Sequence, residues 1–225
     1  MTVYAELVGR HGLAESHRLL LDAVPPGSRV LDVGCAEGYL AARLKERGCT
    51  VIGVEADPTA AERARAACDV VVAGDVQDEA VRTAAEQAVR RMSGGAGAEV
   101  VVLGDVLEHL LDPEGVVRWA AATAPRVVVS LPNIAHWTGR RQLLRGRFPR
   151  EDHGLFDRTH VRFFTRASAR RMVEEAGLRV EREAFAAAPL PLQSRVPALA
   201  RLQPALVSLR PELFALQIVL TCAPR

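Results

Sequence analysis

The residues best suited to chemistry lie in short turns that follow apolar runs. The first such turn is within VLDVGCAEGYL (30–40), and its small residues are Gly34, Cys35, Ala36 and Gly38. Small residues there let the backbone approach a ligand closely. A dinucleotide-binding fingerprint would require a third small residue at position 39, where the chain has Tyr39. The turn therefore predicts a ligand site without a pyrophosphate cradle, and plain turn glycines are the alternative.

Carboxylates follow the next two apolar runs. Glu55 ends VIGVE, and Asp75 follows VVVAG. A carboxylate at the first position could accept hydrogen bonds from both hydroxyls of a ribose, and one at the second from an adenine amino group. Each acid alone is more typical of a solvated loop or a helix cap. Their order, at the ends of successive strands, favours one shared crevice.

An alternation of strands and helices would position these turns. Buried strands are predicted at 29–33, 50–54, 69–73, 99–103 and 126–131, and helices at 12–24, 38–47, 58–67, 78–92, 113–124 and 167–176. Asp57 and Asp112, each before a proline, are predicted N-caps. A sixth strand is expected at LRVEREAF (178–185) and a last one at LFALQIVLTCAP (213–224), with the link 195–209 broken by Pro204 and Pro211. The pattern predicts an α/β fold with a parallel sheet covered on both faces.

The whole chain fits a single domain of 225 residues, with 49% hydrophobic residues. We divide it into a helical lead-in (1–27), a cofactor-binding half (28–131) and an acceptor-side half (132–225). The N-terminus has no apolar run of the kind that a secretory signal contains, and the most apolar stretch, 213–223, is too short to span a bilayer. The four cysteines have no metal-ligand spacing. A cytoplasmic protein with unpaired cysteines is expected.

Positive charge is concentrated in the second half. Ten arginines and only three carboxylates lie between Arg140 and Arg171. This cluster predicts an anionic partner or substrate. The alternative is the solvated face of a short helix, with Leu143 and Leu144 packed inward.

Four motifs together resemble the class I S-adenosylmethionine-dependent methyltransferases. They are VLDVGCAEGYLAARL, VIGVEADP, GDV and VVLGDVLEHLLDPEGVV, and the resemblance covers about residues 28–185. It implies a three-layer Rossmann-like fold whose seven-stranded sheet has its last strand antiparallel, between strands five and six. The implied cofactor-binding residues are Asp32, Gly34, Cys35, Ala36, Gly38, Glu55, Ala56, Asp75, Val76, Asp105 and Val106.

By that resemblance, Asp32, Gly34 and Gly38 flank the methionine part of S-adenosylmethionine. Glu55 binds the ribose, Asp75 and Val76 the adenine, and Asp105 lies near the sulfonium. The chain departs from the family at Ala36, where a glycine is usual.

Methyl transfer to a hydroxyl requires a group that removes the proton, and histidine is the usual choice. The candidate catalytic residues are His160, His136 and His109, with His153 as a weaker candidate. Mg²⁺ held by Glu108, His109 and Asp152 is an alternative, but their spacing is no metal signature, and we predict no metal site.

The segment 130–165 has a narrower resemblance to methyltransferases of polysaccharide and glycoconjugate synthesis. It implies O-methylation of a hydroxyl on a saccharide or glycosylated metabolite, an acceptor that could be anionic. PNIAHWTGRRQLLRGR also resembles the methionine-biosynthesis protein W family, whose members are partners of an acyltransferase. An RNA substrate is the least favoured, because few aromatic residues there could stack on bases. No nucleic-acid partner is expected, and a homodimer is left open.

Overall fold

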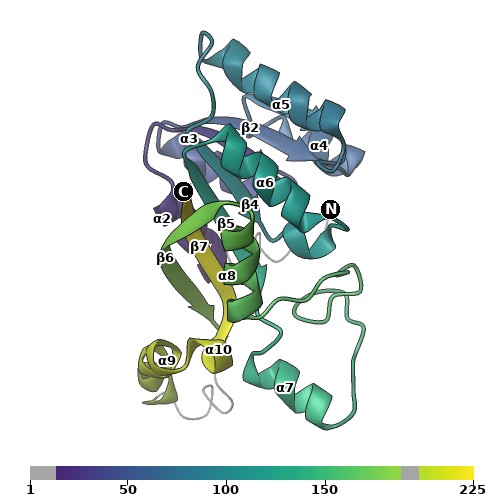
Figure 1. The fold of residues 1–225 in the computed structure, drawn as a ribbon, viewed down its shortest axis with the longest axis vertical. Helices are drawn as coiled ribbons and strands as arrows, with labels where there is room; N and C mark the ends of the chain where they lie inside the picture. The colour runs from purple at the N-terminus through teal and green to yellow at the C-terminus, as the bar shows by residue number, and fades with distance from the viewer. Residues whose placement is uncertain (1–13, 189–197) are drawn as a thin grey trace.

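The computed structural model describes residues 14–188 and 198–225. Its centre is one seven-stranded sheet in the order β3-β2-β1-β4-β5-β7-β6 (Figure 1). The strands are β1 Arg29–Val33, β2 Thr50–Glu55, β3 Val70–Ala73, β4 Val100–Gly104, β5 Arg126–Pro132, β6 Leu178–Ala187 and β7 Ala215–Pro224. The pairs among β1 to β5 are parallel, and β7 is antiparallel to both β5 and β6. The expected fold is confirmed.

Helices cover both faces of this sheet. They are α2 Glu15–Ala23, α3 Tyr39–Glu46, α4 Pro58–Ala64, α5 Glu79–Met92, α6 Pro113–Thr123, α7 Trp137–Leu144, α8 Arg166–Glu175, α9 Ala198–Leu209, α10 Pro211–Phe214 and a 3₁₀ turn η1 Leu107–His109. Successive strand residues point to opposite faces. Leu31 accordingly lies in the core shared with α5, α6 and α8, and Val30 in the core shared with α2, α3 and α4.

Local sequence signals account for several helix starts. The Asp57 side chain accepts a hydrogen bond from Ala60 N at 2.7 Å, and Asp112 accepts one from Gly115 N at 2.9 Å. Both predicted N-caps are confirmed. Thr165 and Ser168 form a capping box at the start of α8, which the sequence analysis did not single out. Each cap ties a helix start to the loop that precedes it.

One prediction about the second half is wrong, and one detail of the alternative reading of the basic cluster does not hold. Helix α9 continues through Pro204, where we expected a break, so the loss of one backbone donor there does not end the helix. Leu143 and Leu144 are not packed inward, because 50% and 88% of their surfaces are exposed. Helix α7, which carries them, lies at the edge of the molecule apart from the sheet (Figure 1).

Three further expectations concern the chain ends of the predicted helices, the cysteines and membrane-spanning segments. Of the predicted helix 12–24, residues 12 and 13 lie outside the described residues, as do residues 195–197 of the link. All four cysteines are free and buried. Within the described ranges, no helix is both long and apolar enough to cross a bilayer.

Candidate functional site

A cleft of about 360 Å³ opens at the carboxyl ends of β1, β2, β3 and β4. Its volume lies within the roughly 300–1,000 Å³ typical of small-molecule sites. The strand order reverses between β1 and β4, the place where ligands bind in open α/β sheets. The predicted residues that line it are Gly34, Ala36, Glu55, Ala56, Asp75, Val76, Asp105, Val106 and His109.

The turn after β1 is held in an unusual backbone conformation. Gly34, Ala36 and Gly38 have φ values of +72°, +48° and +81°. A Cβ on Gly34 would lie 3.0 Å from Val106 Cγ2, and a Cβ on Gly38 would lie 2.8 Å from the Cβ of Ala67. Both glycines are therefore required by close packing as well as by φ. Ala36 adopts a left-handed φ with a side chain present, which costs about 1–2 kcal/mol.

Glu55 connects this turn to the end of β2. Its Oε2 accepts a hydrogen bond from Ala36 N at 2.8 Å, and its Oε1 accepts one from Asp57 N at 2.9 Å. Each carboxylate oxygen keeps further acceptor capacity for a ligand. Asp75 follows the neighbouring strand β3, and its Oδ1 accepts a hydrogen bond from Gln77 N at 2.9 Å. Both carboxylates thus line the cleft, and their contacts with a ribose and an adenine stay a prediction.

Asp105, at the end of β4, is the third carboxylate in the cleft. Its φ is +51°, a strained value for a residue with a side chain. Ser130 Oγ donates to its Oδ1 at 2.6 Å, and Gln217 Nε2 donates to its Oδ2 at 3.1 Å. Partners from β5 and β7 therefore fix this carboxylate where the cofactor side of the cleft meets the second half of the chain.

Sequence reasoning missed His17 of the cleft and Gln217, which donates to Asp105. His17 of α2 lines the cleft, 8% exposed, and its ring meets that of Tyr39 edge-on at 5.0 Å. The buried face of α2 has helical spacing: it includes His17 and Leu20 and continues in Val24, the residue after the helix. A histidine in line with these apolar residues was therefore the sequence feature that could have pointed to this position. Gln217, a half-buried amide side chain within the apolar strand β7, was a similar signal.

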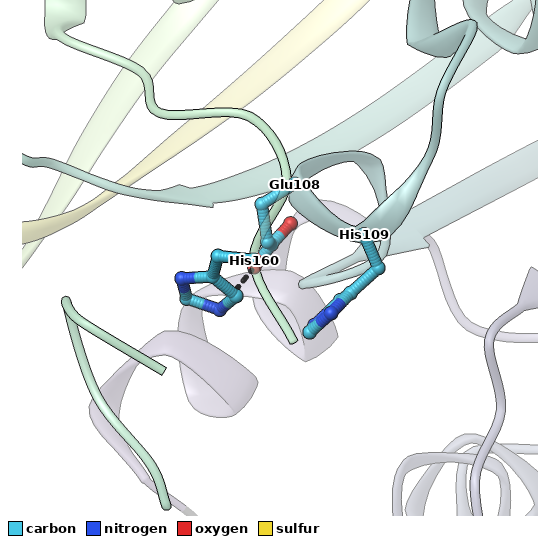
Figure 2. A group of neighbouring side chains, drawn as sticks. All are labelled: Glu108, His109 and His160. Carbon is cyan, nitrogen blue, oxygen red and sulfur yellow. Dashed lines mark ion pairs between the residues drawn. The ribbon is translucent and has the colours of Figure 1, made fainter. Parts of the chain in front are cut away.

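Glu108, His109 and His160 form a cluster beside Asp105, which we call the histidine–carboxylate cluster (Figure 2). One ligand atom from each side chain lies within 4.8 Å of the others. Glu108 is 1% exposed, and its Oε1 lies 4.0 Å from His160 Nε2. The imidazole centroids of His109 and His160 are 4.8 Å apart. Two segments 51 residues apart in sequence thus meet at one point.

The electrostatics of the cluster follow from burial. Burial raises the pKa of Glu108 well above its ordinary value, and the nearby Asp105 carboxylate adds to this. Burial, with repulsion from His109, lowers the pKa of His160. Glu108 Oε2 has no hydrogen-bond partner among the described residues. A neutral His160 beside a buried carboxyl group is therefore the favoured state at neutral pH.

Two further cavities lie on the side of the cluster that faces α7. A cavity of about 50 Å³ is lined by Asp105, Glu108 and His160, and also by Leu155 and Leu216. Leu155 and Leu216 line in turn a third cavity of about 190 Å³, whose wall includes Arg141 of α7. The three cavities are therefore neighbours: Asp105 lies between the first and the second, and Leu155 and Leu216 lie between the second and the third.

Other predicted residues lie elsewhere. Asp32, Cys35 and Gly38 do not line the cleft; they lie in or beneath the turn that forms it. Burial, with repulsion from Glu55, raises the pKa of Asp32 to about 7. The pKa of the Cys35 thiol is raised by a hydrogen bond with Cys68 and by burial.

Among the histidines, His136 is fully buried and lines none of the three cavities. Its Nδ1 lies 2.7 Å from Thr138 Oγ1 at the start of α7, and burial lowers its pKa to about 4. His153 is exposed, and so is Asp152, which pairs with Arg158. Of the metal ligands considered from sequence, Asp152 is thus outside the cluster and His160 takes its place.

The arginines of α7 and its following loop are exposed, at positions 140, 141, 145, 147 and 150. Within the described part of the chain, none of them appears in an ion pair with a carboxylate. Arg141 instead lies over the Trp137 ring at 5.4 Å. The basic cluster therefore keeps its charge available to a ligand.

Comparisons with known proteins agree with this architecture. The methyltransferase domain family model matches residues 6–183. A ubiquinone biosynthesis O-methyltransferase of Escherichia coli is 33% identical over 97 residues, which is 42% of this chain and 38% of the relative. The aligned segment therefore spans less than half of that relative's length.

Two solved structures share the fold at 15% identity. Magnesium protoporphyrin IX methyltransferase of Synechocystis, solved with bound S-adenosylhomocysteine, has a TM-score of 0.60, with 93% of this chain and 80% of that chain covered. An S-adenosylmethionine-dependent methyltransferase of Thermotoga maritima has a TM-score of 0.63, with 99% and 95% covered. Family model, relative and fold point the same way: the chain belongs to the class I S-adenosylmethionine-dependent methyltransferase family.

Proposed function

We propose that the chain transfers a methyl group from S-adenosylmethionine to a hydroxyl oxygen of an anionic acceptor. The observation that carries this proposal is the position of the histidine–carboxylate cluster. It adjoins Asp105 of the cofactor cleft on one side and the cavity leading to Arg141 on the other. A hydroxyl placed there would face both a methyl donor and groups able to handle its proton.

The cleft fits the cofactor. Because Gly34 has no side chain, Val106 packs directly against the turn, and both residues line the cleft. Glu55 and Asp75, at the ends of the adjacent strands β2 and β3, suit the hydroxyls of a ribose and the amino group of an adenine. S-adenosylmethionine supplies an electrophilic methyl group on its sulfonium. Asp105, whose charge lies on the cluster side, would favour that positive centre.

The transfer needs an aligned and proton-free acceptor oxygen. The oxygen–methyl bond forms as the sulfur–methyl bond breaks, the bonding pair returns to sulfur, and the hydroxyl proton must leave. His109 lines the cofactor cleft and His160 the neighbouring cavity, so both imidazoles flank the path between them. His136 is left out of this role because it is buried away from all three cavities.

The acceptor class rests on charge and on the relatives. Arg141 lines the third cavity and forms no ion pair within the described part of the chain, which favours an acceptor with a phosphate or carboxylate, such as a saccharide on a phosphate-linked carrier. The curated relatives are O-methyltransferases of ubiquinone biosynthesis, and a ubiquinone-type hydroxyl acceptor is the second candidate. A partner protein that binds the cofactor without transferring methyl groups is the alternative from another class.

The test is methyl transfer from isotope-labelled S-adenosylmethionine to four acceptor panels: phosphate-bearing saccharides, neutral saccharides, ubiquinone-type hydroxyl compounds and RNA. We expect labelled ether products from the first panel. His160→Ala should lose turnover, whereas the control His153→Ala, at an exposed position, should keep it. Cofactor affinity should be nearly unchanged in both variants. Labelling confined to RNA, or cofactor binding without transfer to any panel, would contradict the proposal.

A further inference from the structure

The histidine–carboxylate cluster has the composition of a metal site rather than of an ion pair. Two imidazoles and one carboxylate converge from η1 and from the loop before α8 (Figure 2). We propose that Glu108, His109 and His160 bind one divalent transition-metal ion. Nitrogen-rich sets of this kind suit Zn²⁺, Mn²⁺ or Fe²⁺, whereas Mg²⁺ prefers oxygen ligands.

The spacing of the ligand atoms supports a shared ion. Metal–ligand bonds of about 2.1 Å hold two ligand atoms of one ion roughly 3–4 Å apart. Glu108 Oε1 and His160 Nε2 are already 4.0 Å apart, which is too long for a direct hydrogen bond. The three ligand atoms lie within 4.8 Å of one another, so a side-chain movement of about 1 Å closes the set.

The surroundings of the imidazoles support it independently. His109 Nδ1 lies 3.3 Å from the carbonyl oxygen of Thr159, which can only accept, so Nδ1 donates and Nε2 is left as a lone pair. His160 makes a backbone hydrogen bond with Leu155, while its Nε2 faces Glu108. Metal-binding histidines are typically oriented in this way, by a carbonyl on the other ring nitrogen.

Glu108 provides the remaining observation. Its side chain is almost fully buried, and Oε2 has no hydrogen-bond partner among the described residues. Backbone N–H groups of Val161 and Arg162 donate to the Glu108 carbonyl, at 2.9 and 3.0 Å, and so fix the histidine loop against η1. Among the described residues no arginine or lysine pairs with Glu108, so without an ion this side chain holds a proton, and a bound cation can take the place of that proton.

The position of the ion gives it a role that rests on the proposed function. It would lie between the cofactor cleft and the cavity behind the cluster, and open coordination positions would face the acceptor. Such an ion would lower the pKa of an acceptor hydroxyl next to it, so that the hydroxyl proton could pass to water before methyl transfer. In this arrangement the imidazoles are ligands of the ion and orient the acceptor through it.

The test is a calorimetric titration of the 225-residue chain, without a tag and stripped of metal by a chelator, with Zn²⁺, Mn²⁺, Co²⁺ and Mg²⁺. We expect one equivalent of Zn²⁺ or Mn²⁺ to bind more tightly than Mg²⁺. Affinity should fall at least ~10-fold in His109→Ala and Glu108→Gln and stay within about twofold in His153→Ala. With Co²⁺, visible d–d absorption should appear in the native chain and His153→Ala and be lost in both cluster variants.

His109→Ala is the decisive variant, because His109 is half-buried and its loss should spare the fold. Stoichiometric Zn²⁺ or Mn²⁺ binding that persists in folded His109→Ala and Glu108→Gln would overturn the inference, as would the absence of binding to the native chain or a preference for Mg²⁺. Cofactor binding with no metal binding would leave the proposed function standing. Metal binding without methyl transfer would leave the site standing and refute the proposed function.

Discussion

Gly38→Ala tests whether close packing of the cofactor turn against α4 is needed for stability. Gly38 has φ +81°, and an added Cβ would lie 2.8 Å from Ala67 Cβ and 3.3 Å from Ala64 Cα. The left-handed φ costs about 1–2 kcal/mol for alanine, and overpacking a well-filled site adds about 1–3 kcal/mol. The free energy of unfolding should therefore fall by about 2–5 kcal/mol.

Gly48→Ala is a matched control at the other end of α3. Gly48 has nearly the same φ, +78°, and no atom lies within 4 Å of an added Cβ. Only the backbone cost applies there, about 1–2 kcal/mol. The effect of alanine on the unfolded chain is the same in both variants and cancels in the comparison.

Urea unfolding measures both variants on one scale, provided that the slope with denaturant stays unchanged. We expect Gly38→Ala to be less stable than Gly48→Ala by about 1–3 kcal/mol. It should also bind S-adenosylmethionine more weakly, whereas Gly48→Ala should bind it normally. Equal destabilisation of the two variants, within about 0.5 kcal/mol, would refute the packing argument.

Three further predictions concern the same site. The pKa of Asp32 is about 7 in the folded protein and about 4 in the unfolded chain, so the folded state holds this proton more tightly. The free energy of unfolding should therefore fall by up to about 4 kcal/mol between pH 4 and pH 8, relative to that of Asp32→Asn. Parallel pH profiles of the two proteins in urea unfolding would contradict this. Ala36→Gly removes the cost of the left-handed φ but raises the conformational entropy of the unfolded chain, so the free energy of unfolding should change by less than about 1 kcal/mol. Cofactor affinity should change by less than about twofold. A tenfold gain in affinity would show instead that the Ala36 methyl group obstructs the turn. Arg141→Ala should raise the acceptor KM several-fold and leave cofactor affinity unchanged. Arg145→Ala is the control, because Arg145 does not line the third cavity, and it should change neither the KM nor the cofactor affinity. Steady-state kinetics with an identified acceptor measure both variants, and equal KM values for the two would contradict the role of Arg141.

Local signals predicted much of the fold and the cofactor half of the site. The apolar runs and the caps Asp57 and Asp112 are short-range features, and each was read from a few adjacent residues. The carboxylates that end β2, β3 and β4 could be placed in one crevice because parallel strands share an edge. Those predictions needed only the strand order, not the packing.

The parts that could not be predicted depend on long-range packing. His17 and Gln217 reach the site from opposite ends of the chain, through α2 and β7, and no local motif marks them. The pairing of His160 with Glu108 likewise depends on how the loop before α8 folds back over η1. The exposure of Leu143 and Leu144 depends on α7 standing apart from the sheet.

The most direct test of the account is calorimetric titration of the purified chain with S-adenosylmethionine and its demethylated product. We predict binding of one molecule in the micromolar range, at least ~10-fold weaker in Glu55→Ala, because that carboxylate holds Ala36 N and Asp57 N as well as facing the ligand. Glu62→Ala, an exposed residue of α4 paired with Arg65, is the control and should bind normally. Absence of binding to the folded chain, or an unchanged affinity in Glu55→Ala, would contradict the assignment of this cleft to the cofactor.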